Sequence, residues 1–188
     1  MNADGLGKIL SEPRLESNCG CPEIGKRKQG AVMVIFMSTK TGPALLFTKR
    51  APDLEEHAGQ ISFPGGALEP SDAGHLSAAL RETDEEVGIG PEELQVLSPL
   101  PLQPVLSSWM IFPFVAWWLK PRALCFNKSE VEQIIMHPLD DLLRQHQAGC
   151  WLIADPEHSC RYQLDGEVLW GATAKITGRL LDRLAASA

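Results

Sequence analysis

Residues 65–89 constrain the fold of this 188-residue chain more than any other segment. Within them, the six residues 81–86, RETDEE, carry four carboxylates and one guanidinium. Good helix formers precede this run and Gly88 follows it, so the sequence predicts a helix that ends at Val87. Carboxylates one helical turn apart repel each other, and such a helix therefore needs a compensating positive charge.

The predicted helix has two faces of opposite character. Apolar residues repeat at helical spacing on one face and are expected to pack on a core. They are Leu76, Leu80 and Val87, with Thr83 in the same stripe. Three glutamates share the other face, which is expected to point outward: Glu82, Glu85 and Glu86. A solvated acidic surface is the simplest interpretation of that face.

Three observations favour a metal site over a solvated surface. A tight loop, FPGG at residues 63–66, precedes the helix and can turn its carbonyls toward the carboxylates. Arg81 stands directly before Glu82 and can orient it. A divalent cation would relieve the repulsion, and hard oxygen ligands suit Mg²⁺ or Mn²⁺. We therefore predict a Mg²⁺ or Mn²⁺ site at this helix.

The spacing of these residues resembles the signature of the Nudix hydrolases. That signature places a glycine, a loop with an acidic residue, and then Arg-Glu-U-x-Glu-Glu-x-Gly-U, where U is bulky and aliphatic. Gly66 and residues 81–89 fit, with Thr83 at one aliphatic position. Asp72 stands in the first acidic slot, and the loop is one residue longer than the signature. The resemblance covers most of residues 29–184 and implies an α/β/α sandwich with a mixed β-sheet.

The flanking segments resemble the coenzyme A pyrophosphatase branch of that family. They are LFTKRA at residues 46–51, HAGQISFPGG at 57–66 and LWGATA at 169–174. The branch also carries the longer loop, with acidic residues where Glu69 and Asp72 stand. This chain departs from the branch at Glu55, where the branch has an arginine that would clamp a phosphate. This charge reversal argues against coenzyme A as the substrate but leaves the hydrolytic centre unchanged.

The resemblance implies a hydrolytic site made from the loop and the helix. The metal ligands would be the Gly65 carbonyl, Glu82, Glu85 and Glu86. Glu82 is the expected general base, with Arg81 orienting it and Glu85 as a further catalytic residue. Substrate-binding residues would be Arg50, His57 and Gln60. His57 could equally be a structural hydrogen-bonding residue, and Arg50 could equally hold one of the acids.

Three functions are therefore compared. The first is hydrolysis of the diphosphate of coenzyme A or its thioesters, giving 4′-phosphopantetheine and adenosine 3′,5′-bisphosphate. The second is hydrolysis of another nucleoside diphosphate derivative, such as ADP-ribose, NADH or a dinucleoside polyphosphate. The third is a non-catalytic nucleotide sensor, which the complete set of core acids disfavours.

Composition limits the partners and the location. A net charge of −7 argues against nucleic acid and anionic membrane as partners, and favours a small phosphorylated substrate. The apolar run at residues 110–119 is too short to span a bilayer. No export signal is visible near the N-terminus, so we expect a cytoplasmic protein. The sequence leaves the oligomeric state open, and a homodimer is one alternative. Five scattered cysteines receive no function.

The remaining pattern predicts an N-terminal extension at residues 1–28, partly mobile or wrapped on the surface, and one domain at 29–188. Strands are expected at residues 31–37, 44–48, 94–97, 112–119, 151–154 and 161–164, with a loop or edge strand at 100–105. A short helix is expected after Asn127, with Glu130 closing its capping box in preference to a catalytic role. Helices are expected from residue 138 and at 169–184, the latter with Trp170 buried and Thr173 facing the strands.

Overall fold

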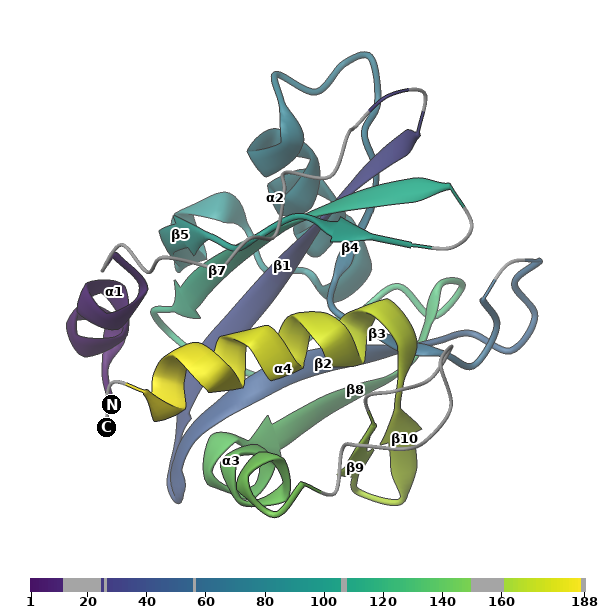
Figure 1. Ribbon diagram of the computed structural model, residues 1–188. Coiled ribbons are helices and arrows are strands. Elements are labelled where there is room, and N and C mark those ends of the chain that lie inside the picture. The colour runs from purple at the N-terminus through teal and green to yellow at the C-terminus, as the bar shows by residue number, and fades with distance from the viewer. Residues whose placement is uncertain (12–24, 26, 56, 106–107, 150–160, 187–188) are drawn as a thin grey trace.

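The structure is a computed structural model that describes residues 1–11, 25, 27–55, 57–105, 108–149 and 161–186. A mixed β-sheet forms its centre, and helices cover both faces of the sheet (Figure 1). The predicted α/β/α sandwich is therefore confirmed.

The described part of the chain forms a central sheet of eight strands. Five lie side by side in the order β3 (Ile61–Ser62), β2 (Gly42–Arg50), β1 (Lys28–Thr39), β7 (Trp109–Trp118) and β5 (Leu94–Pro99). Three more pair with this path: β4 (Gly65–Ala67) with β1, β6 (Gln103–Pro104) with β7, and β8 (Val131–Pro138) with β2. The β1–β7 pair is parallel and the other pairs are antiparallel.

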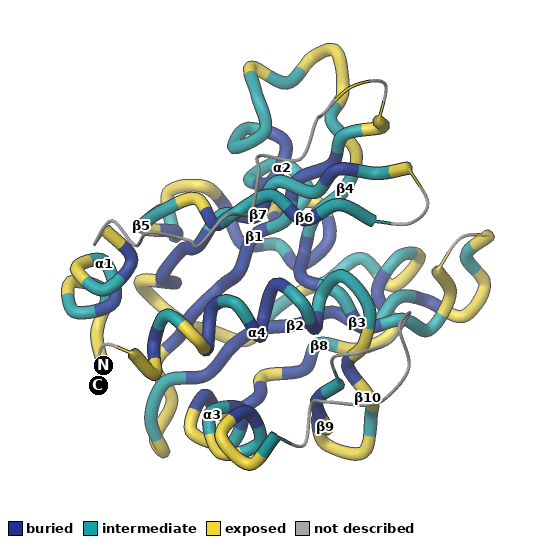
Figure 2. Tube along the Cα trace, viewed as in Figure 1, coloured by how far each residue is buried: buried dark blue, intermediate teal, exposed yellow. Residues whose placement is uncertain are grey.

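The side chains of β1 alternate between two cores, which lie on opposite faces of the sheet. Most of β1 is buried (Figure 2). Val34 and Phe36 belong to one core, whereas Met33 and Ile35 belong to the other. Successive residues of a strand face opposite sides, so a sheet covered on both faces needs continuous apolar strands. The AVMVIFM run meets this requirement, and the predicted strand at residues 31–37 is confirmed.

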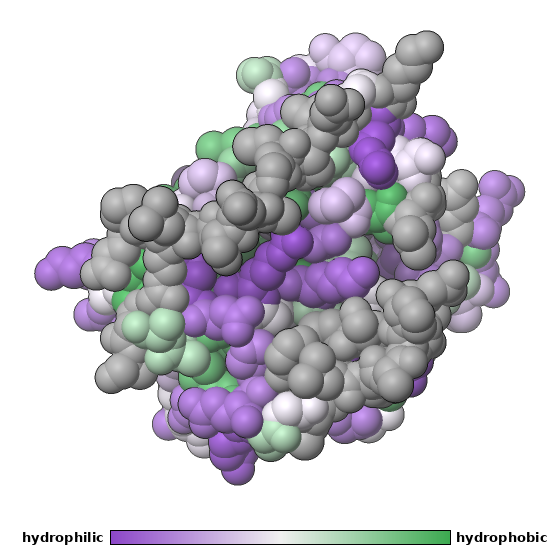
Figure 3. Space-filling model, viewed as in Figure 1, coloured by the Kyte–Doolittle hydropathy of each residue, from purple (hydrophilic) through white to green (hydrophobic). Residues whose placement is uncertain are grey.

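In the described part of the chain, four helices supply the outer layers. One core packs against α2 (His75–Val87), and the other packs against α1 (Ala3–Ser11), α3 (Leu139–Gln147) and α4 (Gly171–Ala185). The predicted inner side of α4 is buried: Ile176, Leu180, Leu181 and Leu184. Between the grey segments in Figure 3, the visible surface over α4 is largely hydrophilic. A hairpin of β9 (Tyr162–Leu164) and β10 (Glu167–Leu169) precedes α4, and a 3₁₀ turn (Pro91–Glu93) follows α2.

Residues 131–138 form strand β8, so the predicted short helix in this region is wrong. The strand pairs along β2, with Met136 opposite Leu46 and Ile135 opposite Phe47. Branched side chains such as Val131 and Ile135 pack well on a pleated sheet. Local spacing favoured a helix because it carries no information about the distant edge of β2, which supplies the backbone partners.

The N-terminal extension contains helix α1, which the sequence pattern did not predict. Leu6 and Leu10 are buried in the same core as α4. Gly5 and Gly7 weaken the local helical propensity, so this helix depends on the core that it contacts. The rest of the extension is mostly outside the described residues. The domain boundary at residue 28 therefore remains a prediction.

Trp170 is 36% exposed, so its predicted burial is wrong. The backbone is still extended at Trp170, and α4 begins at Gly171 rather than at Leu169. Thr173 is only partly buried. The predicted strand at residues 151–154 and four of the five cysteines lie outside the described residues, while Cys125 is a free, exposed thiol.

Candidate functional site

Helix α2 carries the acidic cluster and is anchored at both its middle and its end. Thr83 is buried, and its hydroxyl donates a hydrogen bond of 2.6 Å to the Ala79 carbonyl, so it replaces the expected aliphatic residue without an unpaired polar group. Gly88 adopts a left-handed φ of 69° and donates to the Asp84 carbonyl at 2.9 Å. The predicted C-terminal stop is confirmed.

Two glycines let the loop before α2 lie between the sheet and the helix. A Cβ at Gly65 would stand 2.6 Å from the Cα of Val32 on β1. A Cβ at Gly66 would overlap the carboxylate of Glu82. The backbone of β1 leaves no room for a side chain at Gly65, and a side chain at Gly66 would displace the Glu82 carboxylate, so the loop backbone lies directly against the acids of the helix.

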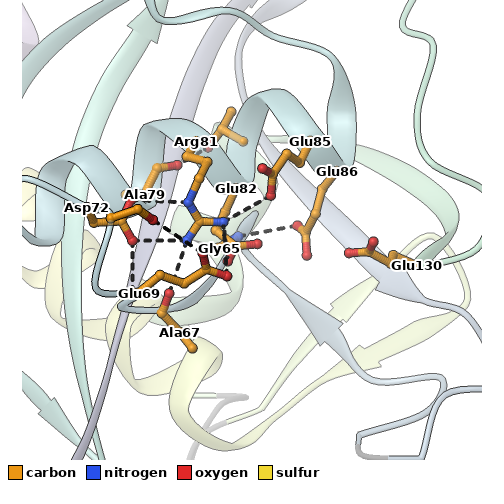
Figure 4. A network of polar contacts seen from close by, with 12 residues as sticks. Gly65, Ala67, Glu69, Asp72, Ala79, Arg81, Glu82, Glu85, Glu86 and Glu130 are labelled. Carbon is orange, nitrogen blue, oxygen red and sulfur yellow. Dashed lines mark hydrogen bonds and ion pairs between the residues drawn. The ribbon is translucent and has the colours of Figure 1, made fainter.

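Arg81 is the hub of the acidic cluster (Figure 4). Its Nε and one terminal nitrogen donate to both carboxylate oxygens of Asp72, each at 3.1 Å. Its other terminal nitrogen donates to Glu82 and to Glu85, each at 3.0 Å. The carbonyl of Ala67 accepts a further bond at 3.2 Å. Arg81 therefore orients Glu82, as the sequence predicted.

Asp72 was noted in the sequence only as a departure from the signature. Its side chain is 3% exposed, and the Arg81 guanidinium holds the pKa of this carboxyl below its usual value. The longer loop thus turns its acidic residue onto Arg81. The presence of an arginine nine positions later was the signal that could have identified this pair.

Glu86 is buried, with 3% of its surface exposed, so its expected outward position is wrong. The Gly65 amide donates to its carboxylate at 3.3 Å, and a terminal nitrogen of Arg50 lies 4.0 Å away. Burial raises the pKa of Glu86 to about 8. The Gly65 amide and Arg50 act in the opposite direction, whereas the nearby Glu82 and Glu130 add to the increase. The helix therefore places one poorly neutralised carboxylate inside the protein.

Glu130 joins this site, although the sequence favoured a structural role for it. It precedes β8, and its carboxylate lies near that of Glu86 (Figure 4). Its negative charge raises the pKa of both Glu82 and Glu86. The β-branched run after Glu130 was the signal that could have placed this residue at a strand start beside the site.

Residues 27–152, more than half of the chain, match the family model of the NUDIX domain. The chain belongs to the Nudix family. Nudix hydrolases are pyrophosphohydrolases that act on nucleoside diphosphate derivatives and generally use divalent metal ions. The predicted family and enzyme class are thus confirmed. In the described residues, no helix is long and apolar enough to cross a membrane.

Relatives match this Nudix chain over most of its length. The Nudix hydrolase NudL of Pectobacterium atrosepticum is 34% identical over 181 residues, which are 95% of this chain and 94% of that protein. NudL of Escherichia coli K12 is 33% identical over 158 residues, 81% of each chain.

Solved structures share the fold at low sequence identity. RenU, a Nudix hydrolase from M. smegmatis, has a TM-score of 0.58 at 17% identity and covers 86% of this chain and 87% of its own. A C. elegans Ap4A hydrolase has a TM-score of 0.56 at 17% identity and covers 85% and 96%. These similarities support the fold alone.

A divalent cation suits the donor set of this Nudix site. Within the described ranges, no three His, Cys, Asp or Glu side chains converge in a metal-binding arrangement in this conformation. Glu82 and Glu85 are instead bonded to Arg81. Burial nevertheless raises the pKa of Glu82 as well as that of Glu86, although Arg81 and Arg50 act in the opposite direction. An oxygen-rich cluster with this unbalanced charge fits a hard divalent ion.

The three predicted substrate-binding residues are linked by hydrogen bonds. Arg50 ends β2, and its amide donates to the Gln60 carbonyl at 3.0 Å. Among the described residues, the buried Nε of Arg50 has no hydrogen-bond partner, which leaves one donor for a ligand. His57 is exposed, and its Nδ1 lies 3.0 Å from the side-chain oxygen of Gln60. Arg50 therefore borders the acids, whereas His57 and Gln60 pair with each other; their roles remain predictions.

Proposed function

We propose that this Nudix hydrolase cleaves the diphosphate linkage of coenzyme A or its thioesters. Water adds to one phosphorus, one P–O bond of the linkage breaks, and the products are 4′-phosphopantetheine, or its acyl form, and adenosine 3′,5′-bisphosphate. The observation that carries the proposal is the Asp72–Arg81 pair, because it gives the longer loop of the coenzyme A branch a defined role at the helix. Similarity to NudL proteins along most of the chain supports a shared set of loops.

The acids of α2 supply the hydrolytic centre in this proposal. The Gly65 carbonyl, Glu82, Glu85 and Glu86 would hold Mg²⁺ or Mn²⁺, which would neutralise the diphosphate and lower the pKa of a water molecule. Glu82 is the proposed base, because desolvation raises its pKa and so strengthens it as a proton acceptor. Arg81 keeps its carboxylate oriented.

Arg50 would bind an oxygen of the substrate diphosphate. Its side chain is 28% exposed, and its charge lies on the site side of β2, near Glu86. His57 and Gln60 would contact the substrate from the loop that follows β2. A cytoplasmic location, a lack of nucleic-acid partners and a homodimeric assembly complete the proposal.

Glu55 supports a second candidate. It is exposed, and it stands where the coenzyme A branch has an arginine. A carboxylate there repels phosphate, which favours a substrate without the 3′-phosphate of coenzyme A, such as ADP-ribose, NADH or a dinucleoside polyphosphate. A non-catalytic sensor is less well supported, because Glu82, Glu85 and Glu86 are all present.

A substrate screen tests the proposal. Coenzyme A, acetyl-coenzyme A, dephospho-coenzyme A, NADH, ADP-ribose, diadenosine tetraphosphate and nucleoside triphosphates are incubated with the protein and Mg²⁺ or Mn²⁺, and products are identified by mass. We expect the highest kcat/KM with coenzyme A or its thioester, and none with Glu82→Gln. A higher kcat/KM for ADP-ribose, NADH or the dinucleoside would replace the first candidate with the second.

A further inference from the structure

We infer that Asn127 is a positioning residue of the hydrolytic site: its side chain holds the carboxylate of Glu130 beside Glu86, where Glu130 contributes to the cation site. This inference rests on the metal-dependent function proposed above and adds two residues to it. Neither belongs to the acidic run of α2, and both lie in the turn at residues 127–130 that leads into β8.

The turn is fastened to the last part of α2. The backbone amide of Asn127 donates to the carbonyl of Glu86 at 2.9 Å. The carbonyl of Asn127 in turn accepts from the amides of Glu130 at 3.1 Å and Val131 at 2.8 Å. Glu130 therefore keeps a fixed position relative to the backbone of Glu86, although the two residues are far apart in the sequence.

The other end of the turn is fastened to the end of β2. The carbonyl of Glu130 accepts from the amide of Ala51 at 2.8 Å. The next residue, Val131, is paired with Arg50 in the β2–β8 ladder. Glu130 thus lies between the acidic helix and the arginine that borders the acids.

The contacts of Asn127 define which way its amide group faces. Its Oδ1 accepts from the Ser129 amide at 3.1 Å and from the Ser129 hydroxyl at 2.6 Å. A backbone amide can only donate, so the oxygen must lie on that side. The Nδ2 group therefore faces Glu130 and donates to its Oε1 at 2.9 Å.

A neutral donor suits a carboxylate that has to bind a cation. Arg81 orients Glu82 and Glu85 and also compensates their charge. Asn127 orients Glu130 without adding a positive charge, and in the described part of the chain Glu130 forms no ion pair. In the described residues, therefore, no cationic side chain competes with a metal ion for Glu130. Partners of this kind, which hold a ligand in place, are worth about 10- to 100-fold in metal affinity or activity.

The test measures Mn²⁺ binding directly, by the electron paramagnetic resonance signal of free Mn²⁺, without substrate. Asn127→Ser keeps a side-chain acceptor for the turn but lacks the amide donor. Glu130→Gln removes the charge, and Asn127→Ser/Glu130→Gln closes a double-mutant cycle. Ser129→Ala is the control, because it removes a hydrogen bond of the same turn and leaves the Asn127 donor in place. Thermal unfolding without metal confirms that each variant is folded.

We expect the Mn²⁺ dissociation constant to rise about 10-fold in Asn127→Ser and in Glu130→Gln. The double variant should bind no more weakly than Glu130→Gln alone, and Ser129→Ala should stay within about twofold of the wild type. An equal loss in Ser129→Ala would overturn the inference, since the turn alone would then explain the effect. A loss from Asn127→Ser that persists in the Glu130→Gln background would also overturn it.

If Asn127→Ser does not fold, Asn127→Asp serves instead, because it is isosteric and keeps the Ser129 acceptor. Its effect on Mn²⁺ binding must become smaller in the Glu130→Gln background; an unchanged effect would contradict the inference. The binding cycle is independent of the substrate. A protein that shows this coupling but does not hydrolyse coenzyme A contradicts only the proposed substrate, whereas a wild type that binds no Mn²⁺ contradicts both proposals.

Discussion

The guanidinium of Arg81 holds both carboxylate oxygens of the buried Asp72, each through a hydrogen bond of 3.1 Å. Asp72 belongs to the loop before α2 and Arg81 to the helix itself, so the pair fastens the loop onto the helix. Arg81 then has one terminal nitrogen left for Glu82 and Glu85. The position of the proposed base thus depends on a carboxylate in the loop that never contacts it.

Replacing Asp72 should therefore impair turnover more than substrate binding. In Asp72→Ala, Arg81 loses its bidentate partner and holds Glu82 less firmly, so we expect kcat to fall about 10-fold or more with a smaller change in KM. Steady-state kinetics with the best substrate measures both constants. Ser71→Ala, in the same loop but exposed, should match the wild type. An unchanged kcat in Asp72→Ala would show that the loop does not position the base.

Glu86→Gln should lose activity and gain stability in the absence of metal. The carboxyl is buried, so the amide removes a charge that desolvation and two neighbouring acids disfavour. We expect hydrolysis to fall about 100-fold or more, because a proposed metal ligand is removed. The melting temperature in EDTA should rise. A variant with wild-type turnover would exclude Glu86 as a ligand.

The gain in stability should depend on pH. The pKa of Glu86 is raised from 4.5 to about 8 in the folded protein, so the folded state binds this proton more tightly than the unfolded state does. Below about pH 4.5 the carboxyl is protonated in both the folded and the unfolded state, so the raised pKa does not reduce stability. Between pH 4.5 and 8 the free energy of unfolding of the wild type falls as the pH rises. Calorimetry in EDTA from pH 5 to 8 should show a widening gap between Glu86→Gln and the wild type. A constant gap would contradict the buried, protonated carboxyl.

Local patterns were sufficient for much of this structure. The continuous apolar run at residues 31–37 supplies side chains to both cores, and Gly88 ends α2, because each depends on neighbouring residues alone. The placement of Arg81 beside Glu82 is also local. These features could therefore be predicted from the sequence.

Features that depend on distant segments could not be predicted. Glu86 lies on the predicted outer face of α2, but the loop with Gly65 packs against Glu86 and buries its carboxyl. The sequence favoured a helix cap at Glu130, but the pairing of β8 with β2 places Val131 opposite Arg50 and the Glu130 carbonyl against the Ala51 amide. In both cases the decisive partner comes from a strand or loop far away in the sequence. The local spacing of apolar residues therefore could not predict it.

Trp170 provides a stability test of the corrected burial. Its side chain is 36% exposed, whereas Trp118 is fully buried on β7. We expect Trp170→Ala to lower the free energy of unfolding by about 1 kcal/mol, within the range of ordinary substitutions, and Trp118→Ala to lower it by about 3–5 kcal/mol. Urea unfolding measures both. A loss of 3 kcal/mol or more in Trp170→Ala would show that the tryptophan is a core residue.

The charge at position 55 tests how this loop acts on the substrate. Glu55 is exposed, so its interaction with a phosphate is screened and is worth about 1 kcal/mol or less, a few-fold in affinity. In Glu55→Arg, repulsion becomes attraction, and the KM for coenzyme A should fall several-fold at low ionic strength with little change in kcat. Added salt should reduce the gain, because screening weakens both interactions.

Two comparisons make the result at position 55 specific. Asp53→Arg makes the same charge change at another exposed residue of the loop, so it separates a general charge effect from a local one. Dephospho-coenzyme A lacks the 3′-phosphate. A gain in affinity that is seen only with coenzyme A therefore locates Glu55 near that group, and an equal gain with both substrates locates it near the diphosphate.

If Glu55→Arg behaves like Asp53→Arg, or leaves the KM unchanged at low salt, position 55 does not contact the substrate phosphates. The departure from the coenzyme A branch would then carry no information about specificity, and the argument for ADP-ribose, NADH or a dinucleoside polyphosphate would lose its support.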